Sequence, residues 1–245
     1  MELIFNKEFT LSRIHVDCFG YAKPSVLLYM MQEAAGEHCK LLNVDKSHLN
    51  RLFWAITRTR VQVTRLPKLG ETVTLKTWPM PTTRVAYPRS VVAYDREGEE
   101  LFRAISLWVL MDEQTRAMVL PGKSGVTVDG TLTGTELAVP HAIATREMLQ
   151  TCQKQVTYSL LDQNGHMNNT RYMDWLDDLL PGDFHKDHQV QEFTLCYMNE
   201  ALEGDKIDLQ FELSEEPVLT ADAQRQGADR SDRIFSAQVI FDGVL

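Results

Sequence analysis

The feature that most constrains the fold of this chain is an approximate internal repeat. Residues 17–30 read DCFGYAKPSVLLYM, and residues 162–175 read DQNGHMNNTRYMDW. Both segments place a glycine three residues after an aspartate, and Gly165 follows Gly20 by 145 positions. A duplicated folding unit leaves this kind of trace, so we expect the two segments to occupy the same place in two related units.

Two later stretches repeat with a nearly constant spacing. Residues 67–75, PKLGETVTL, match residues 201–209, ALEGDKIDL, at a shift of 134 positions. LFRAI at 101–105 matches IFSAQ at 234–238 at a shift of 133. The two copies therefore align at a shift of 145 in the first matched segment and at a shift of 133 or 134 in the two later segments. This difference corresponds to one change of length between the helix and the sheet. Single glycine matches arise by chance, but the three matches together predict a duplication.

The first half of the chain shows a strand, a helix and four more strands. Residues 7–17 alternate with a period of two, which predicts a strand. Pro24 suits the first position of a helix. Residues that are apolar or small, with the exception of His38, recur at helical spacing after it: Leu27, Leu28, Met31, Ala34, Ala35, His38, Leu41 and Leu42. Strand-like stretches follow at 53–66, 71–79, 86–95 and 101–112, which we expect to form an antiparallel meander wrapping the helix.

The same order recurs in the second half. A strand at 155–162 precedes a shorter helix at 168–180, and strands follow at 193–213 (two), 218–226 and 232–243. This layout predicts an α+β protein, a tandem double hotdog in which each antiparallel sheet wraps a central helix. Side-by-side pairing of two such units would cover an open sheet edge. We assign residues 1–120 to an N-terminal hotdog with a degenerate site, 121–150 to a linker, and 151–245 to a catalytic C-terminal hotdog.

Charge and composition exclude several classes of protein. The formal net charge of -9 argues against a nucleic-acid partner. The sequence contains no run of 18 apolar residues, the length needed to span a bilayer. The N-terminus lacks the features of a signal or transit peptide. Four scattered cysteines indicate reduced thiols, and the His and Cys spacing indicates no zinc site. We expect a cytoplasmic protein without metal or cofactor.

The two copies of the repeat differ in chemistry. The second copy has Asn164, His166 and Glu200 where the first has Phe19, Tyr21 and Leu66, whereas Asp162 has a matching aspartate in Asp17. Imidazole and carboxylate groups can act as general bases toward water, and an amide or a backbone N–H near Gly165 can stabilise an oxyanion. The sequence lacks a Gly-x-Ser-x-Gly motif, so a serine triad is not expected. The second copy therefore suits hydrolysis of an activated ester.

QNGHMNNTRYMDW resembles the N-x-H-x-N-N-x-x-Y-x-x-W signature of acyl-acyl carrier protein thioesterases, which comprise plant plastid enzymes and bacterial relatives. Stretches at 27–38, 53–79 and 196–201 agree with that family, so the resemblance covers nearly the whole chain. It implies a cofactor-free thioesterase of fatty acid biosynthesis, whose catalytic residues would be Asp162, Asn164, His166 and Glu200. The plant enzymes have cysteine after the glutamate. Here Ala201 occupies that position, which argues against a thiol nucleophile.

The resemblance also implies a partner, an acyl carrier protein that bears the acyl substrate. Because carrier proteins are acidic, basic residues are the candidates for docking: Arg58, Arg60, Arg65, Lys68 and Arg84. A homodimer is possible, and membrane insertion is not expected. Three alternatives stay open, an acyl-CoA thioesterase, a hotdog dehydratase and a non-catalytic acyl-binding hotdog protein. The last fits poorly, since a binding protein has no need of a buried polar cluster.

Overall fold

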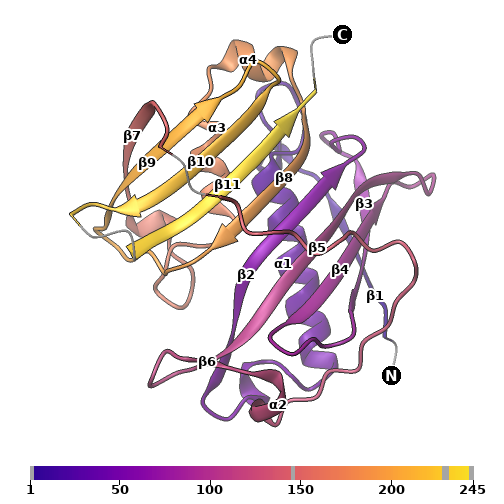
Figure 1. The fold of residues 1–245 in the computed structure, drawn as a ribbon. Helices are drawn as coiled ribbons and strands as arrows, with labels where there is room; N and C mark the ends of the chain where they lie inside the picture. The colour runs from indigo at the N-terminus through magenta and orange to yellow at the C-terminus, as the bar shows by residue number, and fades with distance from the viewer. Residues whose placement is uncertain (1–2, 145–146, 228–231, 243–245) are drawn as a thin grey trace. The chain divides into compact units, whose positions relative to one another are not determined.

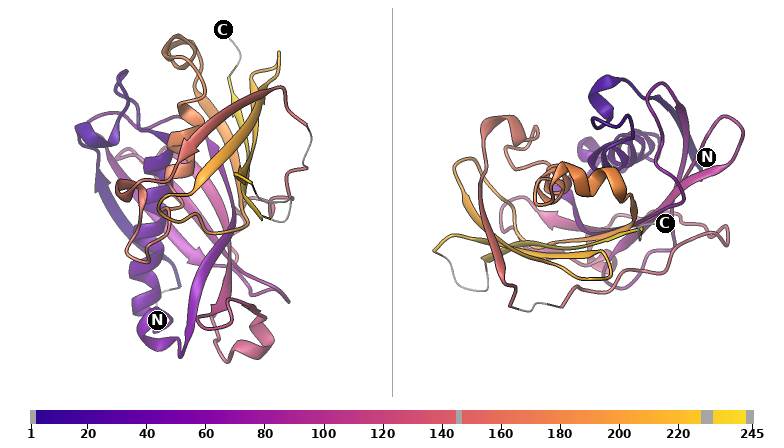
Figure 2. Two further views of the ribbon diagram at one scale, coloured as in Figure 1. Left: turned by 90° about the vertical axis from the view of Figure 1, so that its left-hand side faces the viewer. Right: turned by 90° about the horizontal axis from the view of Figure 1, so that it is seen from above.

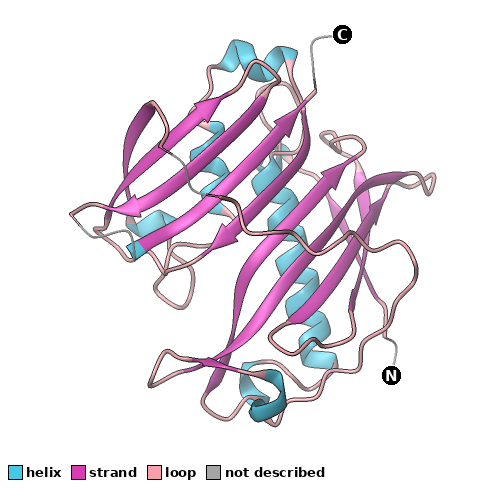
Figure 3. Cartoon of the chain, viewed as in Figure 1, coloured by secondary structure: helices cyan, strands magenta, loops and turns pink. Residues whose placement is uncertain are grey.

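The computed structural model describes residues 3–144, 147–227 and 232–242 (Figure 1). The chain forms two compact units, one made of Met1–Ala22 with Leu27–Pro140 and the other of Lys23–Val26 with His141–Leu245. Each unit contains one antiparallel sheet and at least one helix (Figure 3). In the part of the chain that the structure describes, no helix is both long and apolar enough to cross a membrane.

The first unit contains one long helix and a six-stranded sheet. Its elements are β1 (Phe5–Thr10), α1 (Pro24–Leu41, of which Leu27 onward belongs to this unit), β2 (Leu52–Val63), β3 (Thr72–Pro79), β4 (Tyr87–Tyr94), β5 (Glu100–Asp112), β6 (Met118–Val119) and α2 (Pro121–Ser124). The strands run in the order β1-β3-β4-β5-β2, and β6 pairs with β5. Every predicted strand has a counterpart, although the first covers Phe5–Thr10 rather than 7–17, since Arg13–His15 form a short 3-10 helix. The four-strand meander is wrong. Only β3, β4 and β5 form a meander, because β2 pairs with β5 along its whole length.

Helix α1 begins at Pro24 as predicted. Its apolar face is buried, with Leu27 and Ala34 fully inaccessible to solvent, whereas Leu41 at its end is 60% exposed. His38 on this face stacks on Phe5 of β1, with ring centroids 5.5 Å apart. Figure 2 shows α1 lying along the concave face of the sheet of its unit. Each fully buried Leu or Met side chain on this face stabilises the unit by roughly 1.5–3 kcal/mol.

The second unit repeats this sheet order. Its elements are β7 (Gln150–Gln155), α3 (Arg171–Asp177), α4 (Gly182–Asp187), β8 (Val190–Tyr197), β9 (Lys206–Leu213), β10 (Val218–Arg225) and β11 (Arg233–Phe241). The strands run in the order β8-β11-β10-β9-β7, which matches β2-β5-β4-β3-β1 of the first unit. The second helix is shorter than the first, as predicted, but α4 was not expected. The strand predicted at 155–162 lies instead at 150–155, because the edge strand QTCQKQ has little apolar periodicity.

The repeat is visible in the backbone hydrogen bonds of the loop that precedes each helix. In the first unit, the bonds are Asp17 N to Tyr21 O (2.8 Å), Gly20 N to Asp17 O (3.2 Å) and Ala22 N to Pro67 O (2.7 Å). In the second, they are Asp162 N to His166 O (2.8 Å), Gly165 N to Asp162 O (3.0 Å) and Met167 N to Ala201 O (2.8 Å). Both glycines have positive φ, +86° and +79°, a conformation that costs little only for glycine. The same local structure thus recurs at the predicted shifts of 145 and 134.

The segment expected as a linker is bonded to the first unit over much of its length. Thr131 N donates to Pro79 O at 3.0 Å, and Arg58 Nη1 donates to Pro140 O at 3.1 Å. Glu136 accepts from Trp78 Nε1 at 3.1 Å and from the backbone N–H groups of Thr133 and Gly134. Residues up to Pro140 belong to the first unit and residues from His141 to the second, so the segment 121–150 is divided between the two units.

Glu136 makes the stability of this attachment dependent on pH. Burial alone would raise its pKa, but hydrogen bonds from Thr133 and Trp78 outweigh burial and lower the pKa from 4.5 to about 2. A carboxylate whose pKa is lowered by folding stabilises the folded protein fully at pH values above the pKa that it has in the unfolded chain. This stabilisation is lost as the pH falls toward the folded-state pKa of about 2. The Tm difference between wild type and Glu136→Gln is therefore expected to shrink between pH 4.5 and 2. A difference that stays constant across this range would contradict the assignment.

Candidate active site

The predicted site residues lie on two segments of the second unit. Asp162, Asn164 and His166 occupy the turn between β7 and α3, and Glu200 lies just beyond the end of β8. The backbone brings the two segments together, because Met167 N donates to Ala201 O and His166 forms an isolated antiparallel bridge with Leu202. These contacts place the side chains of His166 and Glu200 opposite each other.

His166 and Glu200 form the central pair of the site. His166 Nε2 lies 3.3 Å from Glu200 Oε2, with the side chains 25% and 42% exposed. Water can reach both groups, and the carboxylate can orient the imidazole or stabilise its protonated form. The expectation of a buried polar cluster is wrong. The pair lies at the surface of its unit, because loops rather than the interiors of strands carry it.

Asp162 and Asn164 form a second pair within the turn. Asp162 Oδ1 accepts from Asn164 N at 2.8 Å, and Asn164 Nδ2 lies 3.4 Å from Asp162 Oδ2, a long contact. Asp17 in the first unit accepts the backbone N–H groups of Phe19 and Tyr21 in the same way. Asp162 therefore holds the turn in shape whatever else it does.

Gly165 supplies the backbone conformation that the turn requires, with φ at +79°. Its N–H donates to Asp162 O at 3.0 Å, and the N–H of Asn164 is bonded to Asp162 Oδ1. Both backbone donors are thus engaged within the turn. Helix α3 begins only at Arg171, so its first N–H groups do not belong to this turn. A role for Gly165 in holding an oxyanion stays a prediction, and the exposed side-chain amide of Asn164 is the more available donor.

Tyr172 of α3 packs its ring in the interior of the second unit, against the rings of Trp175, Tyr197 and Phe235. Tyr172 is 2% exposed, and the centre of its ring lies 4.6 Å from that of Phe235. Burial raises the pKa of Tyr172 well above 10, and the negative charges of Glu200 and Asp162 raise it further. The phenol therefore stays neutral.

The equivalent position in the first unit holds different chemistry. The backbone of Tyr21 forms an isolated antiparallel β-bridge with Lys68, as the backbone of His166 does with Leu202. Lys68 Nζ lies 5.3 Å from the centre of the Tyr21 ring. Leu66, opposite Glu200 in the repeat, is 6% exposed. A cation over an aromatic ring and a buried leucine cannot provide a base.

The structure reduces the number of residues that could bind a metal ion or dock a carrier protein. Within the described ranges, no three His, Cys, Asp or Glu side chains gather closely enough to hold a metal ion. Arg65 donates to Glu71 and Asp95, so its charge is compensated, which removes it from the docking candidates. Arg225 was not predicted as a site residue, yet its guanidinium donates to the backbone oxygen of Glu200 at 2.8 Å. The available signal was its opposite charge to Asp95, the residue at the same place in the first unit.

The fold and the site define a class, the double hotdog proteins with a loop-borne His–carboxylate pair in the second unit. Residues 2–120 match the model of the acyl-ACP thioesterase N-terminal domain, and residues 144–238 match that of the C-terminal domain. The chain belongs to the acyl-ACP thioesterase family.

Curated plant proteins of this family are similar over most of the chain. A chloroplastic acyl-[acyl-carrier-protein] hydrolase, FATB1 of Cuphea viscosissima, is 24% identical over 218 residues, covering 81% of this chain and 51% of its own. The palmitoyl-acyl carrier protein thioesterase of Gossypium hirsutum is 26% identical over 215 residues, covering 81% and 52%. This chain thus spans about half the length of the curated relatives it matches.

Solved structures share the fold over the whole chain. An acyl-ACP thioesterase from Bacteroides thetaiotaomicron superposes with a TM-score of 0.88 at 23% identity, covering 98% of both chains. The 12:0-ACP thioesterase of Umbellularia californica gives a TM-score of 0.83 at 22% identity, covering 99% of this chain and 98% of its own. These similarities confirm the predicted hotdog fold.

Proposed function

We propose that this protein is a thioester hydrolase that releases free fatty acid from acyl-acyl carrier protein. The observation that carries the proposal is the His166–Glu200 pair, 3.3 Å apart, on the loops of the second unit of a chain that belongs to this family. The first unit has Tyr21 and Leu66 at the equivalent positions, so the duplication concentrates the chemistry in one copy.

In the proposed reaction, water attacks the thioester carbonyl carbon. His166, paired with Glu200, takes a proton from the water as its oxygen forms the new C–O bond. Asn164 donates its side-chain N–H to the oxyanion of the tetrahedral intermediate. When that intermediate collapses, the C–S bond breaks and the protonated imidazole returns the proton to the leaving thiolate. The products are a fatty acid and the thiol of the carrier, and Asp162 holds the turn throughout.

The choice of carrier protein over coenzyme A rests on the family and on the names of the relatives, which include hydrolases of acyl-carrier-protein substrates. Both esters share the same thioester chemistry, so the site itself does not separate them. Acyl-CoA hydrolysis is therefore the second candidate. Docking through the remaining basic residues, a homodimer and a cytoplasmic location stay predictions.

Thiol release from matched panels of acyl-carrier-protein and acyl-CoA esters tests the proposal. We expect kcat/KM to be higher with the carrier-bound acyl group at every chain length that is cleaved. Preference for the CoA esters would support the second candidate. Acyl binding without release of thiol from either panel would overturn hydrolysis and favour the binding-protein alternative.

A further inference from the structure

The segment that carries Glu200 leaves the sheet before it reaches this residue. Strand β8 ends at Tyr197, and the last backbone bonds to β11 are those of Met198 N and Asn199 N, which both face Ile234 O at 2.9 and 3.3 Å. Beyond them, the Asn199 side chain donates its Nδ2 to Arg233 O of β11 at 2.7 Å. Glu200 therefore lies on a connection whose position depends on contacts other than the strand ladder. A catalytic carboxylate on such a segment needs other groups to hold it within a fraction of an ångström.

Arg225, the last residue of β10, makes such contacts with three partners. Its Nη2 donates to the backbone oxygen of Glu200 at 2.8 Å, its Nε to Asp205 Oδ2 at 3.1 Å, and its Nη1 to Asp232. Asp205 Oδ2 also accepts the N–H of Leu202 at 2.9 Å. The guanidinium is thus bonded directly to residue 200 and, through Asp205, to residue 202.

We infer that Arg225 is a positioning residue for the reaction, holding the Glu200 carboxylate at His166 by fixing the backbone that carries it. This inference rests on the proposed function. Residues 200–202 contact the His166 turn through Met167 N and Ala201 O, so a shift of this segment would change the 3.3 Å distance between the side chains. The planar guanidinium has donors in three directions and bonds all three partners at once, which a lysine ammonium on a flexible stem does not reproduce.

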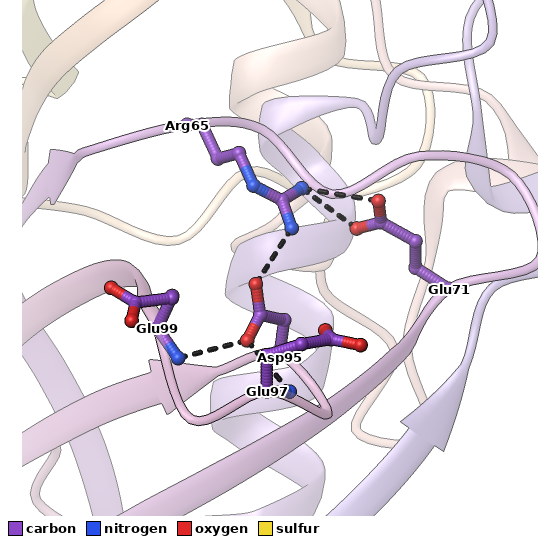
Figure 4. Close-up of polar contacts among 5 residues, drawn as sticks. All are labelled: Arg65, Glu71, Asp95, Glu97 and Glu99. Atoms are coloured by element: carbon purple, nitrogen blue, oxygen red, sulfur yellow. Dashed lines mark hydrogen bonds and ion pairs between the residues drawn. The ribbon is translucent and has the colours of Figure 1, made fainter.

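The first unit provides a natural comparison. There Arg65 joins Glu71 and Asp95, and Figure 4 shows its guanidinium between these two carboxylates, with Asp95 also accepting backbone N–H groups of the turn. Glu71 corresponds to Asp205 in the repeat, and Asp95 corresponds to Arg225.

Both units therefore contain an arginine between two carboxylates, but the two arginines are at different positions of the repeat. In the first unit the arginine is Arg65, which follows the end of β2. In the second unit it is Arg225, the last residue of β10, and Asn199 stands at the position equivalent to Arg65. The relocated guanidinium donates to the backbone oxygen of Glu200 in addition to its two carboxylates. The added bond is found in the unit that carries the His–carboxylate pair.

The test compares Arg225→Gln with Arg65→Gln, which disrupts the matching arrangement in the first unit. We expect Arg225→Gln to lower kcat by about 10- to 100-fold with little change in KM, since a shift of about 1 Å in a catalytic group can cost that much. Arg65→Gln is expected to change kcat by less than about twofold, while both variants lower Tm to a similar extent. Equal kcat losses in the two variants, or an Arg225→Gln enzyme with wild-type kcat, would overturn the inference.

A double-mutant cycle with Glu200→Gln shows whether Arg225 acts through the carboxylate. In the Glu200→Gln background, Arg225→Gln should lower kcat by less than about threefold, and an undiminished further loss would contradict positioning. Arg225→Lys, which retains the charge beside Asp205 and Asp232, serves if the glutamine variant does not fold, and its kcat should also fall. A wild type inactive on every thioester would overturn the proposed function and this inference together. An active wild type with an unaffected Arg225→Gln variant would overturn this inference alone.

Discussion

Replacing His166 with alanine is expected to lower kcat by about 10²–10⁴-fold, the usual contribution of a general base, with little change in KM. The imidazole is the group paired with Glu200 at 3.3 Å, and without it neither attack by water nor departure of the thiolate has its proton carrier. Steady-state thiol release with the best carrier-bound substrate measures the effect. Tm should change little, because the side chain is partly exposed and lies on a loop.

His185→Ala is the control for this experiment. His185 lies on α4, where Nε2 is 2.9 Å from Asp177 O, and it takes no part in the proposed reaction. We expect its kcat to stay within about twofold of wild type. A loss of kcat as large as that of His166→Ala, or retention of activity by His166→Ala, would remove His166 from the mechanism.

Replacing Glu200 with glutamine is expected to lower kcat by about 10²–10³-fold. The substitution keeps the shape of the side chain but removes the charge that orients His166 and stabilises its protonated form. Because His166 and Glu200 act as one unit, the double variant should be nearly as active as the worse single variant. Losses that multiply in the double variant would show that the two residues act independently.

Glu203→Gln provides the matched control. Glu203 is an exposed glutamate on the same connection between β8 and β9, so its substitution makes the same chemical change a few residues away. We expect unchanged kcat and KM. Glu200→Asp separates charge from position, since the shorter side chain keeps the charge but withdraws it from His166. Its kcat should lie between those of wild type and Glu200→Gln.

Local periodicity predicted most elements because burial of one face leaves a regular pattern. Helix α1 begins at Pro24 and buries the predicted apolar face, and β2 to β5 all lie where their apolar residues indicated. The pattern failed at β7, a polar edge strand, and at α4, a short helix after Pro181. It also could not show that β2 pairs with β5 rather than β3, because periodicity reports which face of a strand is buried and not which strand lies beside it.

The candidate site, like the fold, was predicted from the sequence only in part. Comparison of the two copies within one sequence singled out Asn164, His166 and Glu200, since a duplicated position that gains a titratable or amide group stands out against its partner. Burial of the cluster was wrongly expected, because exposure depends on neighbours that are distant in the sequence. Arg225 was missed for a related reason. Its partners Glu200 and Asp205 lie 20 or more positions away, so nothing local marks the contact.

The sequence by itself determined the duplication, the strand–helix–strands order of each unit, the family and the copy in which the polar residues gather. These properties are written in periodicity, spacing and residue type along the chain. The tertiary structure alone decided the order of strands in each sheet, the 3.3 Å approach of His166 to Glu200 and the three bonds of Arg225. Each of these depends on side chains and carbonyl groups from separate segments meeting in space, which only the packed chain brings about.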